Sequence, residues 1–255
     1  MRLLILATVF IVVACYPLNY LFAQSLNSAD EKKLAELMAQ MTLEEKIGQL
    51  NQYSGFEVVT GVMDDSNAAR RQSMARKGML GSVLNVLGSK DVREMQKVAV
   101  EETRLGIPLI FAFDVIHGYR TIFPIPLAES TSWDLDAIER SARIAAIEAS
   151  AVGVNWTFAP MVDISRDPRW GRVMEGAGED TYLGSLIAQA RVKGFQGTDL
   201  TANDTIAACA KHFVGYGASM AGRDYSTVDI SERALWETHL PPFKAAKDIG
   251  VKTFM

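Results

Sequence analysis

Three short stretches of this chain gather side chains that could bind a neutral polar ligand. In the first, residues 111–118, an apolar run ends in Asp114. A carboxylate is expensive to bury unless other groups donate to it, and its two oxygens can accept from two neighbouring hydroxyls, as a sugar ring offers them. A purely local role, in which Asp114 caps a turn, fits the same residues. His117 is expected to be structural, supporting the turn at Gly118.

The second stretch, residues 163–172, reads Asp-Ile-Ser-Arg-Asp-Pro-Arg-Trp-Gly-Arg. So many charges could form a solvated surface network. Trp170, with the neighbouring proline and glycine, instead indicates a rigid loop, and an aromatic face beside arginine donors is a surface on which pyranose rings stack. We expect Arg166 or Arg169 to pair with an aspartate, and Arg172 to reach the ligand.

The third stretch, residues 210–217, places Lys211 and His212 at the end of an apolar run, where both could donate to hydroxyl oxygens. Adjacent residues of a strand face opposite sides of the sheet. Both side chains therefore reach one site only if the backbone is bulged or contains a cis peptide bond. We predict such an irregularity within residues 211–214.

Other reaction classes find little support. The three histidines, His117, His212 and His239, have no metal-ligand spacing. Removal of a leader that contains Cys15 would leave Cys209 as the one cysteine, so a zinc site is not expected. Neither a Gly-x-Ser-x-Gly nucleophile turn nor a phosphate-binding loop occurs. We expect no metal site.

The composition is that of a globular protein with a neutral ligand. Of 255 residues, 49% are hydrophobic and 22% are charged, which argues against a disordered chain, and two cysteines exclude a disulfide framework. The formal net charge is −4, and it becomes −5 when Arg2 is removed with the leader described next. Because lysine and arginine do not cluster, nucleic acid is not an expected partner.

Residues 1–23 are predicted to be a secretory signal peptide. Arg2 precedes a twelve-residue apolar run, and a cleavage site falls near Ala23. The run is short for a membrane span, so no stable span is expected after cleavage, although an uncleaved anchor is an alternative. Cys15 also fits a lipoprotein box. The prediction is a periplasmic or secreted protein, with lipid anchoring through Cys15 as the other possibility.

The remaining chain alternates between helical and strand periodicity. A helix is expected over 30–50 and a surface loop over 55–75. Beyond them, strands are expected at 79–86, 107–114, 154–163, 206–214 and 251–255, and helices at 91–105, 135–152, 182–195 and 231–249, the last capped by Ser231 and interrupted at its prolines. Such alternation indicates βαβ units and a parallel sheet.

Two α/β architectures fit this pattern, a (β/α)8 TIM-type barrel and an open doubly wound sheet. No Gly-x-Gly-x-x-Gly follows the first strand, which disfavours the open sheet. Polar residues gather after strand ends, at 114–120, 163–172 and 211–224, where barrels carry their active sites. The barrel is therefore predicted, with five to six of its eight units in this chain.

The predicted domain organisation follows from that count. Residues 1–23 are the signal peptide, 24–78 an N-terminal helix and loop region, and 79–255 a truncated barrel. Because the last apolar run has no closing helix, we expect the sequence to be the amino-terminal part of a longer protein.

The motifs together resemble glycoside hydrolase family 3, and most of all its periplasmic bacterial β-glucosidases. The resemblance runs from Met-Thr-Leu-Glu-Glu-Lys at 41–46 to Met255 and includes Asp-Val-Ile-His-Gly, Arg-Asp-Pro-Arg-Trp-Gly-Arg and Ala-Lys-His-Phe. It implies a barrel followed by an α/β sandwich domain, and retaining, exo-acting hydrolysis of terminal β-D-glucosyl residues without a cofactor. Carried over to this chain, the resemblance implies that the terminal sugar is bound in the −1 subsite by Asp114, Arg172, Lys211 and His212.

Retaining glycosidases need two carboxyl groups, a nucleophile and an acid/base. The resemblance implies that the nucleophilic aspartate, in a Ser-Asp motif, and the glutamate acid/base both lie beyond Met255, so this chain alone is expected to lack turnover. The related β-N-acetylglucosaminidases carry a His-Asp pair after the Lys-His strand, and Gly-Tyr-Gly at 215–217 disfavours that branch. The alternative function is a non-catalytic periplasmic sugar-binding module. Glucosides, xylosides and oligosaccharides all stay open as substrates.

Overall fold

The computed structural model describes residues 28–55, 65–86 and 88–255. The expected signal peptide and Cys15 lie outside this part of the chain. The chain divides into two compact units, residues 1–42 and 43–255. The first contains helix α2 (Ser28–Gln40), whose first turn carries Asp30 and Glu31, where negative charge complements the helix dipole. In the described ranges, no helix is long and apolar enough to cross a membrane.

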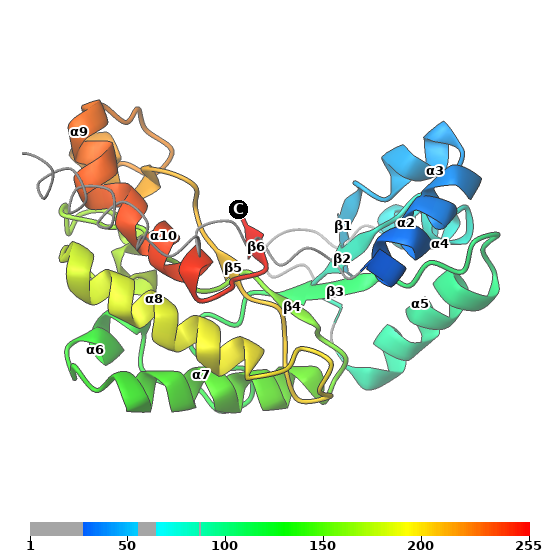
Figure 1. Ribbon diagram of the computed structural model, residues 1–255, viewed down its shortest axis with the longest axis horizontal. Coiled ribbons are helices and arrows are strands. Elements are labelled where there is room, and N and C mark those ends of the chain that lie inside the picture. Colours follow the sequence, from blue (N-terminus) through cyan, green and yellow to red (C-terminus); the bar gives the residue numbers. More distant parts are fainter. Residues whose placement is uncertain (1–27, 56–64, 87) are drawn as a thin grey trace, which may run out of the picture. The chain divides into compact units, whose positions relative to one another are not determined.

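The second unit is built on parallel strands that follow one another in chain order. Strands β1 (Gln52–Ser54), β2 (Ser82–Leu84), β3 (Ile110–Phe113) and β4 (Trp156–Thr157) form one sheet, and β5 (Cys209–Ala210) pairs in parallel with β6 (Thr253–Phe254). Single parallel bridges, Trp156 to Ala207 and Met161 to Lys211, join the two groups. Neighbouring strands in space are thus neighbours in sequence (Figure 1).

Helices connect successive strands, as right-handed crossovers require. They are α4 (Asp65–Arg76), α5 (Ser89–Glu101), α6 (Pro126–Ser130), α7 (Leu135–Ser150), α8 (Thr181–Gln196), α9 (Glu232–Ala234) and α10 (Leu240–Asp248), while α3 (Leu43–Gly48) precedes β1. Short helical turns complete the loops at η1 (Gly171–Glu175), η2 (Tyr216–Ala218), η3 (Met220–Gly222) and a π-helical turn η4 (Leu235–His239).

The two longest crossover helices have clear starting signals. The Asp134 carboxylate accepts from the Ala137 amide at 2.8 Å to begin α7, and Asp180 accepts from the Leu183 amide at 2.6 Å to begin α8. Such caps stabilise a helix by about 1 kcal/mol. The two helices pack closely, because a Cβ on Gly194 would lie only 2.6 Å from the Ala142 side chain.

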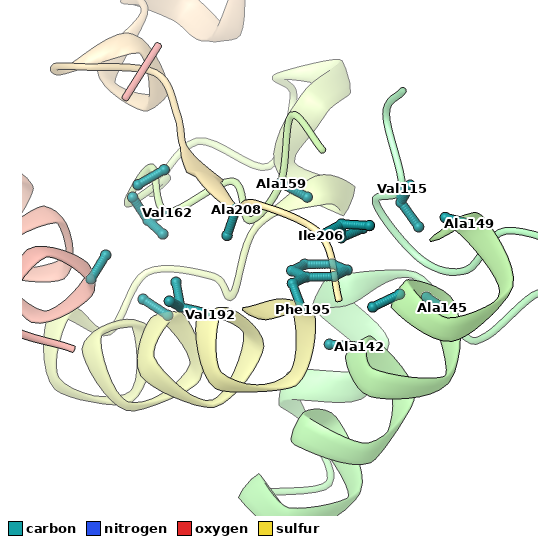
Figure 2. Packing of buried hydrophobic residues seen from close by; sticks show 14 of the residues in the cluster. Val115, Ala142, Ala145, Ala149, Ala159, Val162, Val192, Phe195, Ile206 and Ala208 are labelled. Atoms are coloured by element: carbon teal, nitrogen blue, oxygen red, sulfur yellow. The ribbon is translucent and has the colours of Figure 1, made fainter. Parts of the chain in front are cut away.

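The main core lies between the strands and helices α7, α8 and α10. Figure 2 shows Phe195 between Ile206 and the small alanines of α7, with Val192 beside them. The alanines of α7, at 142, 145, 146 and 149, are almost fully buried and let the helix approach the strands. A second cluster, which includes Val83, Met95 and Phe111, fills the space under α5.

Several predicted elements differ from the structure. The helix expected over 30–50 is two helices, because the chain is non-helical at 41–42. The loop expected over 55–75 is wrong from Asp65 onward, where α4 begins, and β1 precedes the first predicted strand. The capping role of Ser231 is confirmed by its 3.2 Å bond from the Ala234 amide. The domain boundary expected at 78–79 stays a prediction, although β1 already belongs to the sheet.

Candidate functional site

The site is formed where three parallel strands end. Asp114 follows β3 and Lys211 follows β5, while Asp163 lies beyond β4, two residues after Met161, which bridges to Lys211. Parallel neighbours present their carboxyl ends at one edge of a sheet, so residues far apart in the sequence meet there.

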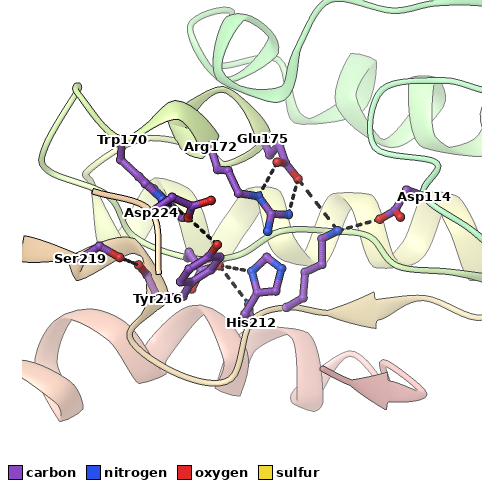
Figure 3. Close-up of polar contacts among 10 residues, drawn as sticks. Asp114, Trp170, Arg172, Glu175, His212, Tyr216, Ser219 and Asp224 are labelled. Atoms are coloured by element: carbon purple, nitrogen blue, oxygen red, sulfur yellow. Dashed lines mark hydrogen bonds and ion pairs between the residues drawn. The ribbon is translucent and has the colours of Figure 1, made fainter. Parts of the chain in front are cut away.

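Lys211 is the buried cation of this cluster. Its side chain is 4% exposed, and its Nζ donates to Asp114 Oδ1 at 2.7 Å and lies 3.9 Å from Glu175 Oε2 (Figure 3). A buried ammonium needs such partners, because an unpaired charge in the interior is very costly. The structure thus brings Lys211 and Asp114 together, as the sequence predicted.

Arg172 approaches the same carboxylate from the other side. Its Nε and Nη2 donate to the two oxygens of Glu175, at 2.6 and 2.9 Å, in a bidentate pair. The guanidinium also lies 5.4 Å from the centre of the Tyr216 ring. The bond to Glu175 raises the pKa of Arg172 despite partial burial, so its positive charge is fixed.

Burial on its own would raise the pKa of Glu175. The hydrogen bonds from Arg172, followed by the charges of Arg172, Lys211 and His212, outweigh that effect and hold the pKa below its ordinary value of 4.5. Glu175 is therefore ionised at neutral pH. It cannot act as a general acid there, because it has no proton to donate.

His212 is oriented by a carboxylate beneath it. Asp163 Oδ2 accepts from the His212 backbone amide at 2.9 Å and lies 2.8 Å from ring Nδ1. Because Nδ1 faces this carboxylate, Nε2 is the ring nitrogen on the opposite side of the imidazole. The chain has cis peptide bonds at Lys211–His212 and Phe213–Val214, which confirms the predicted backbone irregularity.

An aromatic cluster supports this arrangement. The Trp170 indole donates to Asp224 Oδ1 at 3.0 Å, and the Tyr216 hydroxyl donates to the same oxygen at 2.5 Å (Figure 3). Burial, followed by the bond to Asp224, raises the pKa of Tyr216 to about 12, so the phenol keeps its proton. The Tyr216 ring meets both Trp170 and His212 edge-on, with centroids 4.9 and 4.8 Å apart.

The expectation of a stacking face at Trp170 is wrong, because its side chain is completely buried. The expected Arg–Asp pair is present, since Arg169 Nη2 lies 2.7 Å from Asp167 Oδ2. His117 has the structural contact predicted for it, with Nδ1 2.9 Å from the Phe123 carbonyl oxygen.

A hollow of about 440 Å³ lies against the cluster. Asp114, Arg172 and Glu175 line its polar side, and its other walls are formed by Ile116, His117, Gly118, Ile122, Pro126 and Met174. A mostly apolar hollow with a few converging polar groups is typical of small-ligand sites. Of the four predicted binding residues, Asp114 and Arg172 line the hollow, and Lys211 contacts two of its lining carboxylates. His212 does not line it and contacts Tyr216 edge-on.

Sequence reasoning missed Glu175 and the role of Asp163. The spacing of Arg172 and Glu175, three residues apart, is a signal for Glu175 once η1 is known to be helical. The contact of Asp163 with His212 spans 49 residues and has no local signal. Within the described ranges, no group of three or more His, Cys, Asp or Glu side chains could hold a metal ion.

Parallel strands in chain order, crossover helices and a polar cluster at the strand ends define a barrel-type α/β protein, and comparison with known proteins identifies its family. Residues 42–255 match the model of the glycosyl hydrolase family 3 N-terminal domain, so this chain belongs to glycosyl hydrolase family 3. The structure is accordingly a partial (β/α) TIM-type barrel, as predicted from the sequence.

Relatives and solved structures agree with this assignment. The chain is 43% identical over 217 residues, 85% of its length, to the periplasmic β-glucosidase of Salmonella typhimurium, of which it covers 28%. It is similar to a Listeria innocua β-glucosidase solved with glucose, with a TM-score of 0.79, 43% identity and coverage of 88% of this chain and 32% of that one. An exo-1,3/1,4-β-glucanase mutant from Pseudoalteromonas gives a TM-score of 0.78 and 31% identity, covering 91% of this chain and 39% of that one.

The chain therefore spans about a third of the length of these relatives.

Proposed function

We propose that this chain forms the glycone-binding part of a retaining, exo-acting β-glucosidase. In this proposal Asp114, Arg172, Lys211 and His212 hold the terminal non-reducing β-D-glucosyl residue in the −1 subsite. The observation that supports it is a network of ion pairs at the hollow. Lys211 contacts both Asp114 and Glu175, and Arg172 forms a bidentate pair with Glu175.

The charges of that network suit an uncharged ligand. Two carboxylates, Asp114 and Glu175, are balanced by the cations of Lys211 and Arg172, so an ionic ligand gains no net attraction there. Asp114 Oδ2 is an acceptor, and the N–H groups of Arg172 that do not bind Glu175 are donors, held in place by these contacts. Vicinal sugar hydroxyls both donate and accept, so they match such a pair.

The cleavage chemistry is proposed to come from other residues. A retaining mechanism needs a protonated acid beside a nucleophilic carboxylate. Glu175 does not fit the acid, because its lowered pKa and its bidentate contact with Arg172 keep it ionised. We propose that the nucleophilic aspartate and the glutamate acid/base lie beyond Met255, and the greater length of the relatives supports this.

Export is part of the same proposal. The signal-like segment at 1–23 and the name of the Salmonella relative, a periplasmic β-glucosidase, both support a periplasmic or secreted location. Cys15 offers lipid anchoring as the alternative, and mass spectrometry of the exported protein distinguishes the two by the mature amino terminus.

Glucose binding to the chain, measured by isothermal titration calorimetry, tests the glycone site. The Asp114→Asn variant is expected to bind glucose about 10-fold more weakly, because a hydrogen bond to a charged group contributes about 1.5–3 kcal/mol. The matched control is Asp91→Asn, which changes an exposed aspartate in the first turn of α5.

Failure of the folded chain to bind glucose contradicts the proposed site. Equal affinity of the wild type and the Asp114→Asn variant removes Asp114 from it. Glucose binding without turnover by the protein made from the complete gene favours the alternative function, a sugar-binding module.

A further inference from the structure

One wall of the hollow is a loop that leaves β3 and returns to α6. We call residues 114–126 the hollow wall. It begins with Asp114, and Ile116, His117, Gly118, Ile122 and Pro126 within it line the hollow. Pro126 is also the first residue of α6. The position of Asp114 therefore depends on how both ends of this loop are held.

A buried arginine outside the hollow contacts both ends. Arg191 lies on α8, and its Nη1 donates to the Ile116 carbonyl oxygen at 2.8 Å, while its Nη2 donates to Glu129 Oε2. Glu129 lies on α6, three residues after Pro126. Only 5% of the Arg191 side chain and 9% of the Glu129 side chain are exposed. One guanidinium thus joins the start of the hollow wall to the helix that follows its end.

The middle of the hollow wall has other supports. The Val115 amide donates to Thr157 Oγ1 at 3.1 Å, and Glu148 accepts from the amides of Arg120 and Thr121 at 2.8 Å. The Phe123 amide donates to the His117 carbonyl oxygen at 2.8 Å. These bonds fix the turn itself. Arg191 adds a contact of another kind, because one side chain bonds to both the Ile116 carbonyl and Glu129 of α6.

Stability alone does not account for an ion pair at this position. The surrounding contacts of α7 and α8, among them Ile138, Ile187 and Ala190, are apolar. Replacing a buried ion pair by apolar side chains of similar volume is often neutral or stabilising. Arg191 has, in addition, Nε buried without a hydrogen-bond partner in the described structure. What the arginine adds over an apolar residue is its bond to the Ile116 carbonyl.

We propose that Arg191, held by Glu129, is a positioning residue that fixes the hollow wall and thereby aims Asp114 at the sugar. This inference rests on the proposed glycone site, because it assigns Asp114 the role of a ligand. It extends the site to two buried residues that touch no substrate.

The test compares variants that separate positioning from folding. Arg191→Met strands the Glu129 carboxylate in an apolar region, so it is expected to lose stability. The double variant Arg191→Met/Glu129→Leu removes both charges. Its thermal unfolding midpoint is expected to lie within a few degrees of the wild-type value, although the bond to the Ile116 carbonyl is lost. Arg191→Lys keeps the charge, and Lys193→Met is the control for loss of an exposed cation on the same helix.

Two measurements are made on the full chain, amide hydrogen exchange and glucose affinity. In the double variant, the Val115 and Phe123 amides are expected to exchange about 10-fold faster while α7 amides keep their protection, because only the hollow wall opens more often. Glucose affinity is expected to fall about 3- to 10-fold, with partial recovery in Arg191→Lys and no change in Lys193→Met.

A folded double variant with unchanged exchange in the hollow wall and unchanged glucose affinity overturns the inference. The inference is also overturned if amide exchange in α7 rises as much as exchange in the hollow wall, because the variant has then lost stability throughout the fold. If the wild-type chain binds no glucose, the proposed function fails on its own, and the exchange pattern still decides whether Arg191 fixes the hollow wall.

Discussion

At the scale of single residues, the site depends on carboxylates that hold nitrogen-bearing side chains in place. Asp163 Oδ2 takes both the amide and the ring nitrogen of His212, and Glu175 takes both arms of Arg172. The sequence predicted His212 and Arg172 from their types and spacing. Their carboxylate partners were not predictable from local sequence. Asp163 orients His212 because it is buried beside it, and that burial depends on contacts across the whole fold.

Glu175 is expected to stabilise the fold only while it is ionised. Its folded pKa lies below the ordinary value of 4.5, so its contribution is complete above that pH and is lost as pH falls through the folded pKa. We expect the unfolding free energy of the wild type to decrease on acidification below pH 4.5, measured by urea denaturation. Glu175→Gln should show a smaller decrease there, and should cost about 1–3 kcal/mol at pH 7 through lost charged hydrogen bonds.

The matched control is Glu237→Gln, because Glu237 pairs with Arg233 on an exposed helical surface. Exposed pairs contribute at most about 1 kcal/mol. Identical pH profiles for Glu175→Gln and the wild type would show that the charge of Glu175 does not stabilise the fold.

At the scale of elements, periodicity predicted the crossover helices well and the strands less well. Helices α7 and α8 begin and end within a few residues of the predicted bounds, because each has an apolar face and an aspartate cap. Helix α4 was missed because its sequence, in which arginine and serine interrupt the alanines, has no apolar stripe. Strand β1 is only three residues long with no buried position, so alternation could not reveal it.

The loop that carries Tyr216 is expected to require glycine at position 217. A Cβ there would lie 2.6 Å from the Ile164 carbonyl oxygen and 3.2 Å from Asp163 Cβ. Gly217→Ala must therefore push η2 away from the segment that holds His212. We expect thermal unfolding to show a loss of about 1–3 kcal/mol, as for other overpacked sites.

Gly171→Ala is the control in the neighbouring loop, where a Cβ would meet nothing within 4 Å. A Gly217→Ala variant as stable as Gly171→Ala would mean that the close approach of η2 to Ile164 is not maintained in solution.

At the scale of the whole molecule, strand order explains why separate motifs meet. Each strand pairs in parallel with the next one along the chain, so the residues that follow β3, β4 and β5 gather at one edge. Alternation of strands and helices predicted this convergence. The exact partners did not follow from it, since the Lys211 contact with Asp114 joins residues 97 positions apart and depends on side-chain packing.

Residues 24–255 alone are expected not to hydrolyse an aryl β-glucoside. A binding site without a nucleophile cannot form the covalent glycosyl intermediate. Release of the aryl alcohol, followed by absorbance, should equal that of a Lys211→Met/Asp114→Asn double variant. Hydrolysis clearly above the double variant would mean that this chain holds its own nucleophile, and Glu175 would then be the first carboxylate to test.

The four tryptophans of the chain are distributed unequally between surface and interior. Trp133 and Trp236 are 74% and 64% exposed, whereas Trp170 is sealed between Tyr216 and the Asp224 carboxylate. Dissolved collisional quenchers such as iodide meet the outer indoles first. The fluorescence that remains after quenching therefore comes largely from the interior indoles. One of these is Trp170, which can report on the surroundings of Tyr216 and His212 without an attached dye.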